Sequence, residues 1–79
     1  MKAFVVIWND RHMDTDVTVF LDSDKAIEWA RKQAREYDPF NDYQETVLTQ
    51  DMKKCGWIFD VKYSCENDGL CVVEKDVIE

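Results

Sequence analysis

A group of polar, chemically versatile side chains lies between two hydrophobic segments near the start of the chain. The candidate functional residues there are Asp10, Arg11, His12, Asp14 and Asp16. Carboxylates and an imidazole are common ligands of divalent metals. However, the spacing lacks the glycine and the final glutamate of a calcium-binding loop, and Arg11 would repel a cation. We therefore expect no metal here.

His12 could serve as a general base held in place by a neighbouring aspartate. The sequence around it supplies neither a nucleophile nor a group that would stabilise an oxyanion, so we expect no catalytic residue and no enzyme activity. Two interpretations of the segment stay open. It can be a polar hairpin loop whose charges compensate one another, or a recognition surface on which Arg11 and His12 donate directional hydrogen bonds.

The cysteines do not suggest a reactive site. The chain has three of them, Cys55, Cys65 and Cys71, with no CxxC pair. Cys65 and Cys71 flank a predicted turn, but a disulfide needs Cβ atoms closer together than most cross-strand pairs place them. We expect free thiols packed as small apolar side chains. The only imidazole is distant in sequence, which argues against a thiol enzyme.

The charge balance excludes several classes of partner. The 79 residues include seventeen acidic and ten basic ones, giving a net charge of -7. Binding to nucleic acids or anionic membranes depends on lysine and arginine, so neither is expected. Much of the acidic surplus falls in predicted turns, including Glu66 and Asp68. It indicates either simple solubility or an acidic surface that meets a basic partner.

The hydrophobic pattern predicts four strands and one helix in the order β-β-α-β-β. The strands are expected at residues 3–8, 17–21, 57–65 and 70–74, and the helix at residues 24–37 behind a cap at Asp22 or Ser23. The segment after Pro39 has a weaker pattern. It could hold an extra strand around Glu45 to Thr49 or a second short helix, and the strand is favoured.

The last two strands form a predicted hairpin. Alternation places one set of side chains on one face and a second set on the other: Trp57, Phe59, Val61, Tyr63 and Cys65 against Asp60, Lys62 and Ser64. A three-residue loop at 67–69, with Gly69 at positive φ, would close the hairpin. This register places Lys62 opposite Glu74 and Cys65 opposite Cys71, and the opposite charges of the first pair support it.

These elements predict a single α+β domain over residues 1–79. Its two layers are an antiparallel sheet of four to five strands and one helix packed on one face. Residues 3–8 (AFVVIW) supply apolar side chains to both faces of the sheet. The second face is then covered either by the segment 38–54 or by another protein. We expect a homodimer or a complex with a partner protein, not a stable monomer at micromolar concentration.

The chain is expected to be cytoplasmic. Its first apolar run, residues 3–8, is far shorter than the ~18 residues that span a membrane. The beginning of the sequence also lacks the layout of a signal peptide.

Four segments together resemble a known group of proteins. They are DRHMD at 10–14, AIEWA at 26–30, GWIFDVKYSCENDG at 56–69 and VVEK at 72–75. This order is similar to small, acidic, mostly uncharacterised proteins of bacteriophages, plasmids and their hosts, in which a DRHxD-like element precedes a GW…YSxExD-like hairpin. Small acidic phage proteins are often anti-defence factors, anti-CRISPR proteins among them, and that analogy is one of class and size.

The resemblance implies a non-enzymatic protein that inhibits a nucleic-acid-handling or defence protein of a host cell by direct contact with its basic surface. The candidate contact residues are Asp10, Arg11, His12, Asp14, Asp16, Tyr63, Glu66 and Asp68. The alternative is a homo-oligomeric module that binds a small molecule or sequesters a signalling nucleotide, with Arg11, His12 and Tyr63 as contacts. A structural domain without a ligand is a third interpretation. No cofactor is expected.

Overall fold

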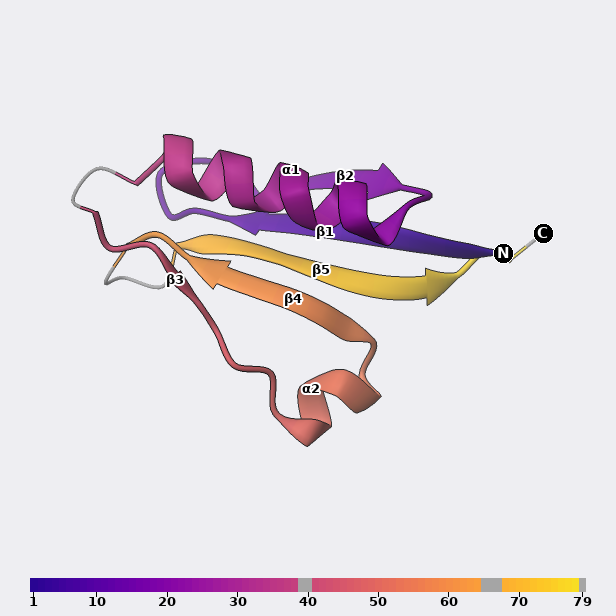
Figure 1. Ribbon diagram of the computed structural model, residues 1–79. Coiled ribbons are helices and arrows are strands. Elements are labelled where there is room, and N and C mark those ends of the chain that lie inside the picture. Colours follow the sequence, from indigo (N-terminus) through magenta and orange to yellow (C-terminus); the bar gives the residue numbers. More distant parts are fainter. Residues whose placement is uncertain (39–40, 65–67, 79) are drawn as a thin grey trace.

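The computed structural model describes residues 1–38, 41–64 and 68–78. They form an open five-stranded antiparallel sheet in the order β2-β1-β5-β4-β3, with the long helix α1 on one face (Figure 1). The predicted α+β class is therefore confirmed. The elements are β1 (Lys2–Asn9), β2 (Asp16–Phe20), α1 (Ser23–Glu36), β3 (Gln44–Glu45), α2 (Gln50–Lys54), β4 (Trp57–Lys62) and β5 (Gly69–Asp76). Neither described helix is long and apolar enough to cross a membrane.

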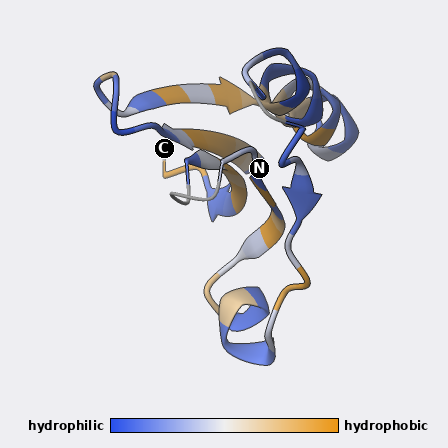
Figure 2. Cartoon of the chain, turned by 90° about the vertical axis from the view of Figure 1, so that its left-hand side faces the viewer, coloured by the Kyte–Doolittle hydropathy of each residue, from blue (hydrophilic) through white to orange (hydrophobic). Residues whose placement is uncertain are grey.

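Helix α1 begins and packs as its sequence predicts. The Asp22 carboxylate caps it by accepting a 3.1 Å hydrogen bond from the backbone N–H of Lys25. Ala26, Ala30 and Ala34 are buried against the sheet. Because alanine side chains are small, the helix axis can lie close to the strands. Figure 2 shows most of the helix ribbon in the hydrophilic colour.

The core lies between α1 and the sheet. Val6, Val61, Leu70 and Val72 are its fully buried aliphatic side chains. Trp8 lies at one end of this layer, where its ring meets that of Tyr37 edge-on at a centroid distance of 4.8 Å. The core therefore consists of side chains from the three central strands and one helix.

The segment after α1 differs from the favoured prediction. The expected strand from Glu45 to Thr49 is only the two-residue β3, and the second short helix, α2, follows it. Thr49 ends the extended stretch because its hydroxyl accepts a 3.2 Å hydrogen bond from the N–H of Met52 and so caps α2. Both elements lie at the β4 edge (Figure 1). The helix α2 therefore does not cover the second face over β1 and β2, because these two strands contact no described helix except α1.

A bulge at the start of β4 makes the alternation of side chains differ from the predicted one. Phe59 lies opposite Val72, as expected for the face under α1, but Trp57 lies opposite Val73, which belongs to the other face. The extra residue between them, Ile58, shifts the register. Trp57 therefore does not share a face with Phe59.

The register of the β4–β5 hairpin also differs from the prediction. Lys62 lies opposite Gly69 rather than Glu74, and Cys71 lies opposite Asp60 rather than Cys65. The connection is longer than three residues because the N–H of Tyr63 donates to the carbonyl of Asp68 and closes a wider loop. Cys65 and Glu66 lie outside the described residues.

The second face of the sheet is apolar but unevenly exposed. Its cross-strand rows are Val17–Ile7–Cys71–Asp60 and Val19–Val5–Val73–Trp57. In the middle of the sheet Cys71 and Val73 are buried by their neighbours, whereas the two valines of β2 are exposed. The apolar surface that was expected across this whole face is therefore concentrated on β2.

The environments of two cysteines predict different reactivities. Cys55 is exposed and Cys71 is buried, and both are free thiols. Burial raises the pKa of the Cys71 thiol, so little thiolate forms near neutral pH. Alkylation followed by peptide mass spectrometry should label Cys55 quickly and Cys71 only after addition of denaturant. Equal labelling rates, or a disulfide at Cys71 in the untreated protein, would contradict this expectation.

Candidate functional site

Carboxylates gather at one end of the molecule. The β1–β2 loop, the last turn of α1, residues 41–43 and the β4–β5 connection all meet at this end (Figure 1). We define the acidic end as residues 10–16, 35–38, 41–43, 63–64 and 68. These described residues contain seven carboxylates and two guanidinium groups: Asp10, Asp14, Asp16, Glu36, Asp38, Asp42 and Asp68 against Arg11 and Arg35.

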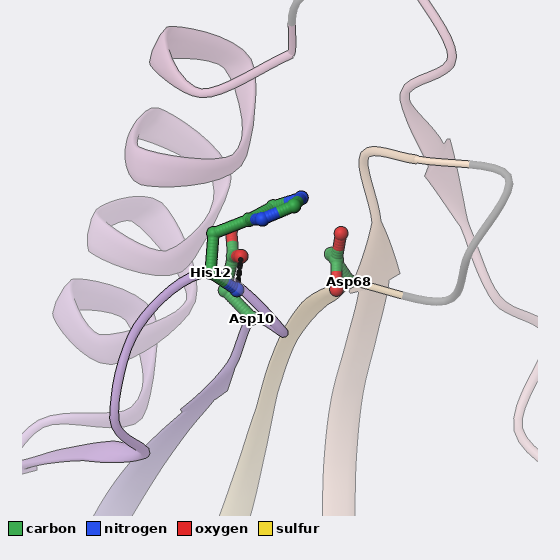
Figure 3. A group of neighbouring side chains, drawn as sticks. All are labelled: Asp10, His12 and Asp68. Carbon is green, nitrogen blue, oxygen red and sulfur yellow. Dashed lines mark hydrogen bonds between the residues drawn. The ribbon is translucent and has the colours of Figure 1, made fainter.

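Two of its loops are joined by buried and half-buried polar groups. Asp10 and His12 come from the β1–β2 loop and Asp68 from the β4–β5 connection, and their side chains face a common space (Figure 3). The N–H of His12 donates to Asp10 Oδ1 at 2.8 Å, and the N–H of Arg11 donates to Asp68 Oδ1 at 3.0 Å. We call this group the loop joint.

Tyr63 supports the loop joint from beneath. Only 2% of its surface is exposed, and its hydroxyl accepts a 2.9 Å hydrogen bond from Trp8 Nε1 and donates one to Asp10 Oδ2. Burial raises the pKa of Tyr63, and its hydrogen bond to Asp10 raises it further. The same bond is the main cause that lowers the pKa of Asp10 below 3.8. Tyr63 therefore positions Asp10 from within the core and offers no surface contact.

Asp68 fixes the second loop. The residue is 5% exposed, and its Oδ2 accepts a 3.0 Å hydrogen bond from Ser64 Oγ. Because its Oδ1 also accepts the hydrogen bond from the N–H of Arg11, the Asp68 carboxylate links two residues that are 57 positions apart in sequence. A buried carboxylate is stable only when such donors replace its hydration, so Asp68 holds the backbone at Arg11 and the side chain of Ser64 close to it.

The loop joint anchors two segments and also groups three possible ligand atoms. One ligand atom from each of Asp10, His12 and Asp68 lies within 4.8 Å of the others, so the three residues could approach a small cation. All four carboxylate oxygens also accept a hydrogen bond from the protein, which holds the two carboxylates in place. The arrangement orders the loop that carries the exposed side chains of Arg11 and His12.

The structure brings together some of the sequence-predicted residues and separates others. Asp10, His12, Asp68 and Tyr63 contribute side chains to the loop joint, and Arg11 contributes its backbone. Asp14 is exposed on the same loop and Asp16 is exposed at the start of β2, both outside the joint. Glu66 lies outside the described residues.

The sequence analysis missed two supporting residues. Trp8 donates to Tyr63, and Ser64 donates to Asp68. A hydroxyl four residues before a turn aspartate is a weak signal, and the position of Trp8 at a strand end is no signal of a polar role. Both depend on tertiary pairing that local patterns do not contain.

A pocket lies within the acidic end. Its volume is about 450 Å³, and it is lined by Arg35, Asp38, Asn41 and Tyr43. Asp38 shapes it by accepting hydrogen bonds from the N–H groups that follow, including that of Tyr43 at 3.0 Å. The guanidinium of Arg35 lies 5.0 Å from the centroid of the Tyr43 ring. The pocket thus combines one cation with an aromatic wall.

Comparison with known proteins gives no relative. The chain matches no protein-family model, no curated protein and no solved structure. The functional argument therefore depends on the acidic end, the pocket within it and the exposed strand β2.

The Tyr63–Asp10 hydrogen bond predicts a pH effect. Because the pKa of Asp10 is lowered in the folded state, its contribution to stability is present above its ordinary pKa and is lost as the pH falls through the folded value. Tyr63→Phe should raise the pKa of Asp10 toward 3.8. The loss of stability in the variant should therefore be largest at neutral pH and smaller in acid. The part that remains in acid comes from the buried Trp8 Nε1–H, which loses its acceptor at every pH.

An NMR titration of the Asp10 carboxyl carbon, together with urea unfolding at several pH values, measures both effects. Tyr37→Phe is the matched control, because it removes the hydroxyl of an exposed tyrosine and keeps the ring beside Trp8. An Asp10 pKa that is the same in the parent and in Tyr63→Phe would contradict the assigned role of Tyr63.

Proposed function

We propose that this protein is a non-enzymatic binding protein whose acidic end docks on a basic surface of a partner protein. The observation that carries the proposal is the loop joint, which orders the loop of Arg11 and His12 and places carboxylates around it. A recognition loop that is ordered before binding loses less conformational entropy when the partner docks.

The charge of the acidic end suits a partner that handles nucleic acid. A groove that binds phosphates is lined with lysine and arginine, and carboxylates grouped at one end of the protein can occupy the positions of the phosphates. Association would be fast and sensitive to salt, because opposite charges steer the two proteins together. The resemblance to proteins of mobile elements is consistent with an inhibitor that blocks such a groove in a host nucleic-acid-handling or defence protein, within the cytoplasm.

The pocket supports a second candidate function, the binding of a small molecule. Its volume of about 450 Å³ lies within the range of ligand sites. Arg35 could pair with an anionic group, and the ring of Tyr43 could stack on a planar one. A nucleotide has both chemical features. This site is adjacent to the loop joint and does not include Tyr63.

Native mass spectrometry of the protein isolated from its own cells separates the two functions. A co-purifying protein that dissociates in high salt supports the docking proposal. A bound small molecule that is lost in Arg35→Ala supports the pocket instead. Isolation of the chain with neither, at low salt and from cells that express it naturally, would count against both.

A further inference from the structure

Strand β2 is an open edge of the sheet. Among the residues that the structure describes, β2 pairs with β1 alone, whereas the opposite edge ends in the two-residue β3, with α2 close behind it in sequence. Natural proteins protect an exposed edge with lysine, proline, a bulge or a covering element. The sequence of β2, DVTVF, has no lysine or proline, and its pairing with β1 is regular. This edge is therefore suited to pairing with another strand.

The exposed apolar side chains of the sheet lie on this strand. Val17 is 55% exposed and Val19 is 60% exposed, although both belong to a strand. In the centre of the same face, Ala3, Cys71 and Val73 are buried without any partner protein. Pairing at the edge would cover the two valines, whereas stacking on the face would mostly cover residues that are already buried.

The direction of each peptide group in β2 shows which backbone N–H and C=O groups point away from β1. The N–H of Val17 donates to the carboxylate of its neighbour Asp16 at 3.0 Å, so it does not donate to β1. Because N–H and C=O directions alternate along an antiparallel strand, Val17 and Val19 present their backbone groups at the open edge. The backbone N–H and C=O groups of Thr18 point toward β1.

We propose that β2 pairs antiparallel with β2 of a second copy, centred on Thr18, so that two five-stranded sheets become one continuous sheet. Val17 then lies opposite Val19 of the second copy, and each such pair exchanges two backbone hydrogen bonds. The two Thr18 residues meet on the two-fold axis. Valine pairs and threonine pairs are favourable cross-strand neighbours.

The sequence of β2 selects a second copy as the occupant because the strand is self-complementary in this register. The only charged residue, Asp16, falls opposite Phe20 of the second copy, so the two carboxylates lie at opposite ends of the paired strands. In the single chain the N–H of Val17 donates to the Asp16 carboxylate. On pairing, this N–H would donate instead to a backbone carbonyl of the second copy. The dimer surface is separate from the pocket and from the loop joint.

Sedimentation equilibrium of the full chain tests the proposal. The mass should rise from 9.4 kDa toward twice that value between micromolar and millimolar concentration. Val19→Lys places a charge at the edge and should weaken association at least tenfold while the unfolding curve stays cooperative. Val47→Lys is the matched control, because Val47 is an 89% exposed valine far from β2, and this variant should associate like the parent.

Cysteine cross-linking tests the register. Two residues opposite each other at a non-hydrogen-bonded position have Cα atoms about 4.5 Å apart, within the range that a disulfide spans. In a Cys55→Ser background, Thr18→Cys should form a covalent dimer under mild oxidation, and Val47→Cys should not.

A parent chain that stays at 9.4 kDa throughout would overturn the proposal. So would a Val19→Lys variant that associates like the parent, which would indicate face-to-face stacking. A dimer that Thr18→Cys does not cross-link would overturn the stated register. None of these results depends on the partner of the acidic end.

Discussion

Gly69→Ala should destabilise the protein by about 3 kcal/mol or more, a large share of the roughly 4–12 kcal/mol expected for a domain of this size. A Cβ atom at this position would lie 2.0 Å from the carbonyl oxygen of Val61 and 3.0 Å from Cα of Lys62. Both contacts are with backbone, so no side-chain rotation relieves them. β4 and β5 would have to separate at the point where the loop joint begins.

The other glycine of the chain provides the comparison. Gly56 has a φ of +92°, and a Cβ there would lie 2.8 Å from the carbonyl oxygen of Glu74. Gly56→Ala should cost about 2 kcal/mol, because alanine disfavours that φ and its Cβ would press on a backbone oxygen. The loss should be smaller than for Gly69→Ala, where the contact is 2.0 Å. Urea unfolding of both variants measures the order. A Gly69→Ala variant that is as stable as the parent would show that the close approach of β4 and β5 is not required.

Neutralising exposed carboxylates at the acidic end should slow association with the partner about tenfold at low salt. The variant carries Asp14→Asn, Glu36→Gln and Asp42→Asn, which are exposed and outside the loop joint. Asp68 is left unchanged, because its carboxylate is buried and its loss would disturb both loops. The measurement is the association rate constant against ionic strength for the partner captured with the parent.

A control variant has the same net charge but is altered elsewhere. It carries Asp24→Asn, Glu28→Gln and Asp51→Asn, which lie on α1 and α2 away from the acidic end. If association followed net charge alone, both variants would slow equally. The proposed docking surface predicts that only the first variant loses most of the salt dependence, and equal slopes for the two would count against it.

Local sequence patterns were sufficient for α1 and for the architecture. The helix cap at Asp22 and the inner alanines follow from spacing alone, because each interaction lies within one or two turns of the chain. The apolar side chains that residues 3–8 supply to both faces fit the position of β1 between β2 and β5, although the order of the strands was not predicted.

The final hairpin shows why the register could not be predicted. Asn67, Asp68 and Gly69 have the composition of a tight turn, yet Asp68 is buried in the loop joint and Gly69 begins β5. The bulge at Ile58 was hidden because Trp57, Ile58 and Phe59 are all apolar, so a shift of one residue leaves no polar residue misplaced. Hydrophobic alternation cannot detect such a shift.

The candidate site was predicted in part for the same reason. The residues of the β1–β2 loop stand out by composition, but their link to Asp68 requires β1 to pair with β5. That pairing joins the two ends of the chain, and no pattern within either segment specifies it. Sequence analysis therefore found Asp10 and Asp68 separately and could not place them together.

The central position of β1 has a consequence for how the chain acquires its structure. Its register partner β5 begins at residue 69, so the middle of the sheet cannot close until nearly the whole chain is available. During synthesis β1 would pair with β2 first and leave its other edge exposed. Long-range pairing of this kind slows folding and exposes apolar edges meanwhile. We therefore expect slow refolding for so short a chain, and truncation before residue 69 should leave an aggregation-prone fragment.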